Sequence, residues 1–390
     1  MIWSFAPGLE GGAENQTRKI AIELVRRGRH CEIWTAWQKS HWAREEISEG
    51  IRIRRFGRHV PRIAPPLGTP GPLRFWLNLP RTWLARASFM ADVRTYASQA
   101  GRPDVFHLHE PSWLGGFAVE IGRKAHIPVF CQEATFPTLQ APGYDVPNRK
   151  HLSHLKREAW FIAMLPYMAN DMIVKGIPSH RVFLLPSGIV IPDDFSDVEK
   201  SRNVLYIGNF SQSALWKAFD VLLDAWGHVH RDCPGAILTV VGGGDASPWI
   251  DHARKIGVDG SIVFTGRVPH TEPFFRKAGL FVLPSRVEGM SNALLEAMSW
   301  GLPCVVSDIP GNRAVIDHEV NGLVVQVNNS VALAEAIVHL LNNPALRSSM
   351  GSHARKKAES EFDIRCVTDR LLEIYRFVLD EQSGAVKNDH

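Results

Sequence analysis

The amino-acid sequence predicts an α/β protein made of two Rossmann-like domains, each with a parallel sheet covered by helices. Short β-branched runs alternate along the chain with stretches in which apolar residues recur at helical spacing. This alternation is what a parallel sheet covered by helices requires. The 390 residues, of which 45% are hydrophobic and 22% charged, are enough to bury two cores of ordinary size.

The expected strands form two sets. The first set is 33–35, 51–54, 104–107 and 128–131, and the second is 204–207, 237–241, 262–265, 280–283, 304–307 and 323–325. A further strand is expected at 2–5 and is unusually short; a protein start upstream of Met1 would explain its length. Helices are expected at 219–230 and 331–341.

An irregular segment at 186–199 separates the two sets, because Pro-Ser-Gly and a cluster of acidic residues interrupt any regular period there. We therefore expect one domain at 1–193 and a second at 194–361. Residues 362–390 are expected to form a C-terminal helix, over about 363–379, that returns to the first domain, and a tail.

Composition excludes several classes of protein. The balance of 44 basic and 40 acidic residues argues against nucleic-acid binding. The five cysteines lie far apart without a C-x-x-C pair, which argues against a zinc site or a disulfide framework. No secretory leader and no run of about 18 apolar residues is found, so we expect a cytoplasmic protein.

The most informative segment is 280–306, which has the pattern strand, loop, helix, strand. Ser291 or Asn292 is a suitable N-cap and Gly301 a suitable helix end. The free N–H groups and the dipole of such a helix start favour an anionic diphosphate. Glu288 lies before the helix and Glu296 inside it, so two carboxylates can accept hydroxyl hydrogen bonds from a phosphate-linked ligand. Taken alone, two glutamates eight residues apart are more often solvent-facing helix charges.

Glycines follow several expected strands, namely Gly11, Gly12, Gly208, Gly242 and Gly266. In the loop at Gly11 and Gly12 the bare glycines let main-chain N–H groups approach a phosphate. The Gly-Gly-Gly turn at 242–244 is not a dinucleotide fingerprint, since Ser247 occupies the position of the third glycine. In the first domain, strand alternation places His107 and His109 on one face, although a strand histidine is more often structural than catalytic.

The Glu-x7-Glu arrangement of Glu288 and Glu296, with Lys217 after the turn at Gly208, resembles retaining GT-B glycosyltransferases of family 4, also called group 1. The sequence from Glu288 to Met298 is most similar to that of enzymes of bacterial exopolysaccharide and lipopolysaccharide assembly. The resemblance implies the GT-B fold, in which two Rossmann-like domains with parallel sheets face an inter-domain cleft.

The resemblance also implies residue roles. Glu288 would contact the donor sugar and Glu296 the ribose, Lys217 the diphosphate, and His109 would lie near the reacting sugar, which makes His109 and Glu288 the catalytic candidates. The full set of expected donor-binding residues is Gly11, Gly12, Gly208, Lys217, Gly266, Val268, Gly289, Met290, Ser291, Asn292, Leu295 and Glu296.

Three positions depart from the family pattern. Asn209 stands where the family has an arginine of the diphosphate clamp, Ala218 replaces the glycine after the lysine, and Ala314 replaces a glutamate. Asn209 supplies no cation, so Lys217 would carry most of the charge neutralisation.

The expected activity is transfer of a sugar from a nucleoside-diphosphate sugar, a UDP-sugar by the same resemblance, to a hydroxyl of a glycan or lipid-linked acceptor. The family implies retention at the anomeric carbon, and we expect a same-face mechanism without metal or cofactor, since no D-x-D motif is present. Two alternatives stay open: a GT-B epimerase or hydrolase of the sugar nucleotide, and a non-catalytic subunit that binds sugar nucleotides.

Basic and aromatic residues interleave in the segment 73–90 of the first domain. Arg74, Arg81 and Arg86 alternate there with Phe75, Trp76 and Trp83. Such a segment can rest on an anionic membrane surface. The alternative, which Pro80 favours by interrupting the period, is an ordinary amphipathic helix with its tryptophans in the core and its arginines in water.

Overall fold

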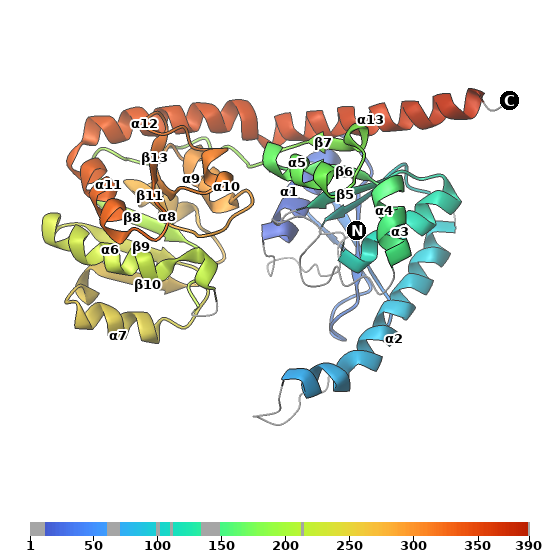
Figure 1. Ribbon diagram of the computed structural model, residues 1–390, viewed down its shortest axis with the longest axis horizontal. Helices are drawn as coiled ribbons and strands as arrows, with labels where there is room; N and C mark the ends of the chain where they lie inside the picture. The colour runs from blue at the N-terminus through green and yellow to red at the C-terminus, as the bar shows by residue number, and fades with distance from the viewer. Residues whose placement is uncertain are drawn as a thin grey trace. The chain divides into compact units, whose positions relative to one another are not determined.

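The structure is a computed structural model that describes residues 12–60, 71–98, 102–109, 112–133, 149–211 and 214–388. The chain forms two compact units, drawn as ribbons in Figure 1. Unit 1 comprises Met1–Leu185 together with Thr368–His390, and unit 2 comprises Pro186–Val367.

Unit 1 contains two sheets among its described residues. One has the order β1-β3-β2, in which β1 (Glu32–Ala36) and β3 (Ile51–Phe56) are parallel and β2 (Glu45–Ser48) is antiparallel to β3. The other is fully parallel with the order β4-β5-β6-β7, formed by Phe106–His109, Val129–Glu133, Trp160–Ala163 and Val182–Leu184.

The helices of unit 1 from α2 to α5 lie between its strands in sequence, as expected for parallel pairing, and α1 precedes β1. They are α1 (Gly12–Arg26), α2 (Gly71–Ser98), α3 (Ser112–Ala125), α4 (Arg149–Glu158) and α5 (Pro166–Val174), followed by a 3₁₀ turn at Ser179–Arg181. The C-terminal helix α13 (Ile364–Asn388) belongs to this unit from Thr368 onward.

Unit 2 is built on a parallel six-stranded sheet with the order β10-β9-β8-β11-β12-β13. In chain order its strands are β8 (Asn203–Ile207), β9 (Ile237–Val241), β10 (Ile262–Gly266), β11 (Leu280–Leu283), β12 (Cys304–Ser307) and β13 (Gly322–Val325). The central strands β11 and β12 are buried at every position, as continuous apolar runs covered on both faces should be.

Helices connect the strands of unit 2. They are α6 (Phe219–Asp232), α7 (Ser247–Lys255), α8 (Glu272–Lys277), α9 (Asn292–Ser299), α10 (Pro310–Arg313), α11 (Ser330–Asn342) and α12 (Pro344–Lys357), with 3₁₀ turns at Leu215–Lys217 and Asp259–Ser261 and a π turn at Ala358–Phe362. Helices α6 and α11 pack on each other and enclose a core with Tyr206, Trp226 and Leu340 fully buried.

The strand order places a topological switch point between β8 and β11, because the chain runs outward from β8 through β9 and β10 and then returns to the other side of β8. In open parallel sheets, ligands bind beyond the carboxyl ends of the strands at such a point. The loops that follow β8 and β11 carry Gly208, Lys217 and Glu288.

The α/β class with two Rossmann-like units and parallel sheets is confirmed, and strands lie at or near every predicted position within the described residues. The predicted strand at 2–5 lies outside them. Three strands escaped prediction, namely β2, β6 and β7. Strand β7 has only three residues, and β2 has the sequence Glu-Glu-Ile-Ser at a sheet edge, so neither shows a clear apolar pattern. Trp83 of α2 is 69% exposed, which contradicts the interpretation that the tryptophans of 73–90 belong to the core.

The unit boundaries differ from the predicted positions at 193/194 and 361/362. Residues 186–193 and 362–367 belong to unit 2, where Arg355 of α12 donates to Pro192 O at 2.7 Å, and the two stretches also pair with each other. Ile189 N donates to Phe362 O at 2.8 Å, and Ile364 N donates to Ile189 O at 2.7 Å. The C-terminal helix also continues to Asn388, nine residues beyond the predicted 379. Within the described ranges, no helix combines the length and the apolar character needed to cross a membrane.

Candidate active site

Glycine turns join the carboxyl ends of three neighbouring strands in unit 2. Gly208 N donates to Val241 O at 3.0 Å, and Gly242 N donates to Gly266 O at 3.0 Å. Gly242 has a φ of 142°, and a Cβ at this position would lie 2.0 Å from Gly208 O. Only glycine permits this close approach, which brings the predicted residues Gly208 and Gly266 to one edge of the sheet.

The Glu288 carboxylate lies beside the Lys217 ammonium at this same edge. Lys217 Nζ is 2.7 Å from Glu288 Oε1, and Ser285 Oγ donates to the same oxygen at 2.7 Å. The side chains of Lys217 and Glu288 are 20% and 12% exposed. Sequence analysis expected the two residues at one ligand, and the structure brings them into direct contact across 71 residues of chain.

The loop that carries Glu288 is held by three polar residues that had no predicted role, namely Ser285, Ser307 and Asn312. Ser307 Oγ donates to the main-chain oxygen of Ser285, and Asn312 Nδ2 donates to Ser307 O at 2.9 Å. A Cβ on Gly311 would lie 2.2 Å from Gly289 O, so α10 packs directly on the loop backbone. The positions of Glu288 and Gly289 therefore depend on the segment after β12.

The start of α9 has the geometry expected of a capped helix. Ser291 is the N-cap, and its side chain accepts a hydrogen bond from Leu294 N. Asn292 is the first helical residue, and Glu296 lies one turn further with a partly exposed side chain. The N–H end of α9 thus begins next to the Glu288 loop, where it favours an anion.

Two other predicted donor-binding residues are buried in unit 2. The side chain of Leu295 is fully buried, and its N–H donates to Ser291 O at 3.1 Å. Met290 is 8% exposed, and its sulfur accepts from Ser187 N at 3.2 Å. Both side chains therefore anchor the loop and the helix that carry the glutamates.

Arg286 holds the turn that presents Lys217. Its main-chain N–H donates to Trp216 O at 2.7 Å, and its guanidinium donates to Leu215 O and, through two nitrogens at 3.0 and 2.6 Å, to Asp220. Burial opposes ionisation of Asp220, but the hydrogen bonds and charge of Arg286 outweigh it, so the pKa of Asp220 is lowered. This arginine was part of the predicted motif but had no assigned role.

The three departures from the family pattern have definite conformations. Asn209 Oδ1 accepts from Ser211 N at 2.9 Å, so the amide stabilises the turn after β8. Ala218 has a φ of 51° in the left-handed region, where a glycine is less strained. Ala314 is the C-cap of α10.

Gly266 and Val268, two more of the predicted donor-binding residues, lie at the end of β10. Gly266 has a φ of 70° and ends β10, and Val268 follows with a partly exposed side chain. Gly266 lies at the carboxyl edge of the sheet, with β9 and β8 between its strand and β11. Its main-chain oxygen accepts hydrogen bonds from Gly242 N and Thr265 Oγ1, both at 3.0 Å.

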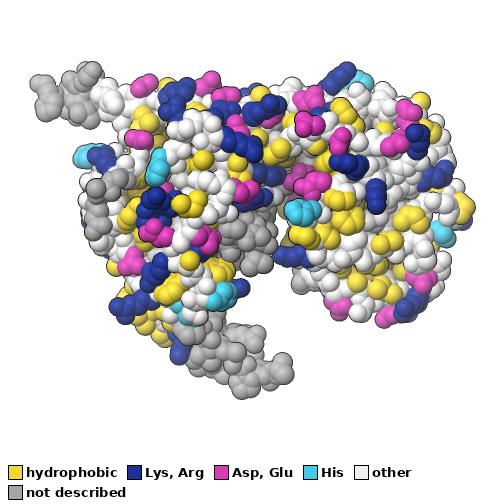
Figure 2. All heavy atoms as spheres, turned by 180° about the vertical axis from the view of Figure 1, so that it is seen from behind, with side chains coloured by type: hydrophobic (Ala, Val, Ile, Leu, Met, Phe, Trp, Pro, Cys, Tyr) yellow, Lys and Arg dark blue, Asp and Glu magenta, His cyan; other side chains and the backbone are white. Residues whose placement is uncertain are grey.

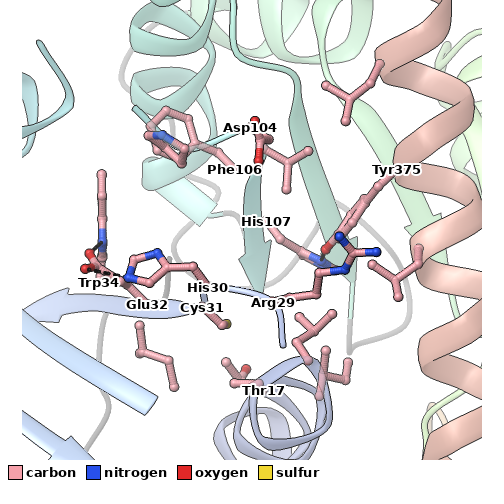
Figure 3. Close-up of a pocket in the computed structure, with 18 of the residues that line it drawn as sticks. Thr17, Arg29, His30, Cys31, Glu32, Trp34, Asp104, Phe106, His107 and Tyr375 are labelled. Carbon is pink, nitrogen blue, oxygen red and sulfur yellow. Dashed lines mark hydrogen bonds and ion pairs between the residues drawn. The ribbon is translucent and has the colours of Figure 1, made fainter. Parts of the chain in front are cut away.

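In unit 1, His109 ends β4 and stacks on His107, with ring centroids 4.5 Å apart and 6° between the ring planes. The predicted common face of the two histidines is confirmed. Tyr375 of α13 points toward His107, and its hydroxyl lies 2.5 Å from Nδ1 (Figure 3). Burial lowers the pKa of His107 to about 3 and holds the pKa of His109 well below its ordinary value. Both rings are therefore neutral near pH 7.

The remaining predicted residues of unit 1 are Gly11 and Gly12. Gly12 is the exposed first residue of α1, whereas Gly11 lies outside the described residues. Figure 3 shows a cavity of about 620 Å³ in this unit, lined by residues of α1, β1, β4 and α13 that include Thr17, Glu32, His107 and Tyr375. This cavity was not predicted from the sequence. No group of three or more His, Cys, Asp or Glu side chains within the described ranges is placed to hold a metal ion.

Comparison with known families gives two matches. Residues 11–188 match the family described as "Glycosyl transferase 4-like domain", and residues 201–343 match "Glycosyl transferases group 1". Together the two matches take in well over half of the chain.

Individual relatives are distant. A glycogen synthase of Mycobacterium tuberculosis is 23% identical over 96% of this chain and 92% of its own. An uncharacterized glycosyltransferase of Haemophilus influenzae is 27% identical, but the alignment covers 41% of this chain and 45% of that protein. The solved structure of Anabaena HepE in complex with UDP-glucose superposes with a TM-score of 0.72 at 18% identity, covering 96% of this chain and 98% of that one.

The switch-point site, the sheet topology and this superposition define a protein of the GT-B fold. The chain belongs to the glycosyltransferases, with a 4-like domain at 11–188 followed by a group 1 domain at 201–343.

Proposed function

We propose that this protein is a retaining glycosyltransferase that moves a sugar from a UDP-sugar to an acceptor hydroxyl in the assembly of a bacterial glycan or glycolipid. The contact between Lys217 and Glu288, beside the N-terminus of α9, is the observation that carries the proposal. It places a cation and a carboxylate at the switch point of the sheet, next to the main-chain N–H end of α9. The UDP-glucose complex of Anabaena HepE and the glycogen synthase relative support this donor and substrate class.

Each proposed role follows from chemistry. Lys217 and the start of α9 would neutralise the diphosphate, and the carboxylates of Glu288 and Glu296 would accept hydrogen bonds from hydroxyls of the sugar and the ribose. Main-chain groups at Gly208, Gly266 and Val268 would line the nucleotide. His109, neutral because it is buried, would contribute a hydrogen bond near the sugar.

The proposed reaction occurs on one face of the sugar. The bond between the anomeric carbon and the diphosphate oxygen breaks, and the acceptor oxygen forms its bond on the same side. The departing phosphate oxygen takes the acceptor proton, so UDP and the glycoside are the products. We propose that no metal ion or cofactor takes part, with Lys217 and main-chain N–H groups in place of a divalent cation. The five cysteines carry no disulfide, which fits the proposed cytoplasmic location.

Product analysis tests the proposal. Purified protein is incubated with a panel of UDP-sugars, with and without glycan and lipid-linked acceptors, and UDP, free sugar and glycoside are quantified. Acceptor-dependent UDP release with an unchanged anomeric configuration by NMR is expected, and EDTA should leave the rate unchanged. Sugar conversion without UDP release would identify an epimerase, free sugar a hydrolase, and donor binding without turnover a non-catalytic subunit.

A further inference from the structure

The ion pair between Lys217 and Glu288 joins two groups to which the proposed function assigns different parts of the donor. Lys217 is assigned to the diphosphate and Glu288 to a hydroxyl of the sugar, yet Lys217 Nζ lies 2.7 Å from Glu288 Oε1. An ammonium beside a carboxylate is neutralised, so the pair presents no net charge to an incoming diphosphate. In the structure, each group therefore satisfies the other instead of a ligand.

The pair is partly withdrawn from water. The side chain of Lys217 is 20% exposed and that of Glu288 is 12% exposed. Water and salt screen the attraction between two such charges less than they screen a fully exposed pair. Transfer of the Lys217 ammonium to a diphosphate must therefore overcome a stronger attraction than that of a surface ion pair.

The main chain is anchored on both sides of the pair. Arg286 holds the Lys217 turn, because its main-chain N–H donates to Trp216 O at 2.7 Å. Gly311 packs on the Glu288 loop so closely that a Cβ there would lie 2.2 Å from the main-chain oxygen of the next loop residue, Gly289. Separation of the pair is therefore left to side-chain rotation, for which the flexible four-carbon stem of lysine is well suited.

Ser285 holds the other member of the pair. Its side chain is fully buried, and its hydroxyl donates to Glu288 Oε1 at 2.7 Å, the same oxygen that Lys217 contacts. When Lys217 departs, the carboxylate keeps this donor and with it its position. Lys217 is therefore the member of the pair that moves.

The surface charge of unit 2 is mixed. Figure 2 shows Lys and Arg side chains interspersed with Asp and Glu over the face of unit 2 that it presents. Such a mixture creates no strong field of one sign that would draw an anion to this face. Attraction of a diphosphate thus depends on local groups, of which the proposed function names Lys217 and the start of α9.

We infer that the Lys217–Glu288 pair is a latch that a diphosphate releases. The ammonium rotates from Glu288 Oε1 to the diphosphate, and the carboxylate, retained by Ser285, then accepts a hydrogen bond from a hydroxyl of the sugar. The two halves of the donor are thereby recognised in sequence, because a sugar without a diphosphate meets a carboxylate that Lys217 already occupies. This inference rests on the proposed function and adds an order of binding events to it.

A double-mutant cycle on UDP binding tests the latch. Calorimetric titration gives the Kd for UDP in the parent protein, Glu288→Gln, Lys217→Met and the double variant. Glu288→Gln alone should tighten UDP binding about 10-fold, because the ammonium no longer has to leave a partly buried carboxylate. The gain should be several-fold smaller beside Lys217→Met, where Glu288→Gln removes only the repulsion between the carboxylate and the diphosphate. The Kd for uridine should stay constant in all four proteins.

Asp317→Asn is the matched control, because its carboxylate also lies 2.7 Å from a lysine ammonium, that of Lys357, in unit 2 but outside the proposed site. This control should bind UDP like the parent protein.

Equal gains from Glu288→Gln with and without Lys217 would overturn the latch and leave the proposed function intact. So would UDP binding by Glu288→Gln that is no tighter than that of the parent, which decides the question even where Lys217→Met fails to fold. A folded parent protein without affinity for UDP would overturn the proposed function and the latch together.

Discussion

Replacing Lys217 with alanine tests the centre of the proposed donor site. In the proposed complex its ammonium donates to a diphosphate oxygen, and a hydrogen bond of this charged kind contributes about 1.5–3 kcal/mol. The Kd for UDP should therefore rise about 10- to 150-fold. The Kd for uridine should stay the same, because a nucleoside has no phosphate for Lys217 to contact. Calorimetric titration of both ligands measures the difference.

The same substitution also affects Glu288, whose carboxylate loses the ammonium at 2.7 Å but keeps the Ser285 hydroxyl. A partly buried carboxylate without its cation destabilises the folded state. We expect Lys217→Ala to lower the melting temperature, and Lys217→Ala with Glu288→Gln to restore it without restoring UDP affinity. Lys200→Ala is the control, since that side chain is 87% exposed on the same unit. Equal loss of uridine binding, or recovery of UDP binding in the double variant, would refute the assigned role.

Three further changes address the rest of the site. Glu296→Ala should raise the donor KM about 10- to 150-fold, the effect of a lost carboxylate–hydroxyl hydrogen bond, and unchanged donor kinetics would remove the ribose assignment. Gly311→Ala places a methyl group 2.2 Å from Gly289 O, so transfer should fall through displacement of the loop; a parent-like rate would show that the loop is not held there. Burial lowers the pKa of His107 to about 3, so the unfolded chain binds the extra proton below pH 6.5 and the free energy of unfolding should fall as pH drops from 6.5. His107→Gln should reduce that slope by about 1.4 kcal/mol per pH unit in denaturant titrations, and an unchanged slope would contradict burial of the neutral ring.

The sequence was sufficient to predict β11 and α9, the strand and helix on either side of the Glu288 loop. Both elements are specified by patterns of residues that are close together in the sequence. The N-cap at Ser291 and the continuous apolar run of β11 are visible without knowledge of the fold. Elements of this kind follow from periodicity and capping chemistry. The lysine at 217, in contrast, was found through the resemblance of its turn to the diphosphate clamp of the family.

Contacts between residues that are far apart in the sequence could not be predicted from sequence patterns. Asp220 and Arg286 are 66 residues apart, and neither residue type nor spacing indicates that they meet. The Gly311 contact with the Glu288 loop also depends on how β11 and β12 lie next to each other. Leu295 stands in the middle of a binding motif, yet its side chain is buried, because α9 turns one face toward the core.

The contacts of Arg286 bear on the proposed diphosphate clamp, in which Asn209 stands at the position of the family's arginine. The guanidinium of Arg286 donates to Leu215, Asp220 and Asn328. These three acceptors direct it to the Lys217 turn, so it does not replace the missing cation. In the proposed complex, Lys217 and the start of α9 therefore meet the phosphate charge with one side-chain cation fewer than the family pattern.

Asn209→Arg tests this account by restoring the cation. The Asn209 side chain is exposed and makes one turn hydrogen bond, to Ser211 N, so an arginine fits without loss of core packing. UDP affinity should increase several-fold and become more sensitive to salt, while uridine affinity stays constant. Asn209→Ala separates the effects, because it removes the turn hydrogen bond without adding charge. If Asn209→Arg binds UDP no better than Asn209→Ala, position 209 does not face the phosphates, and the resemblance of this turn to the family clamp does not extend to its function.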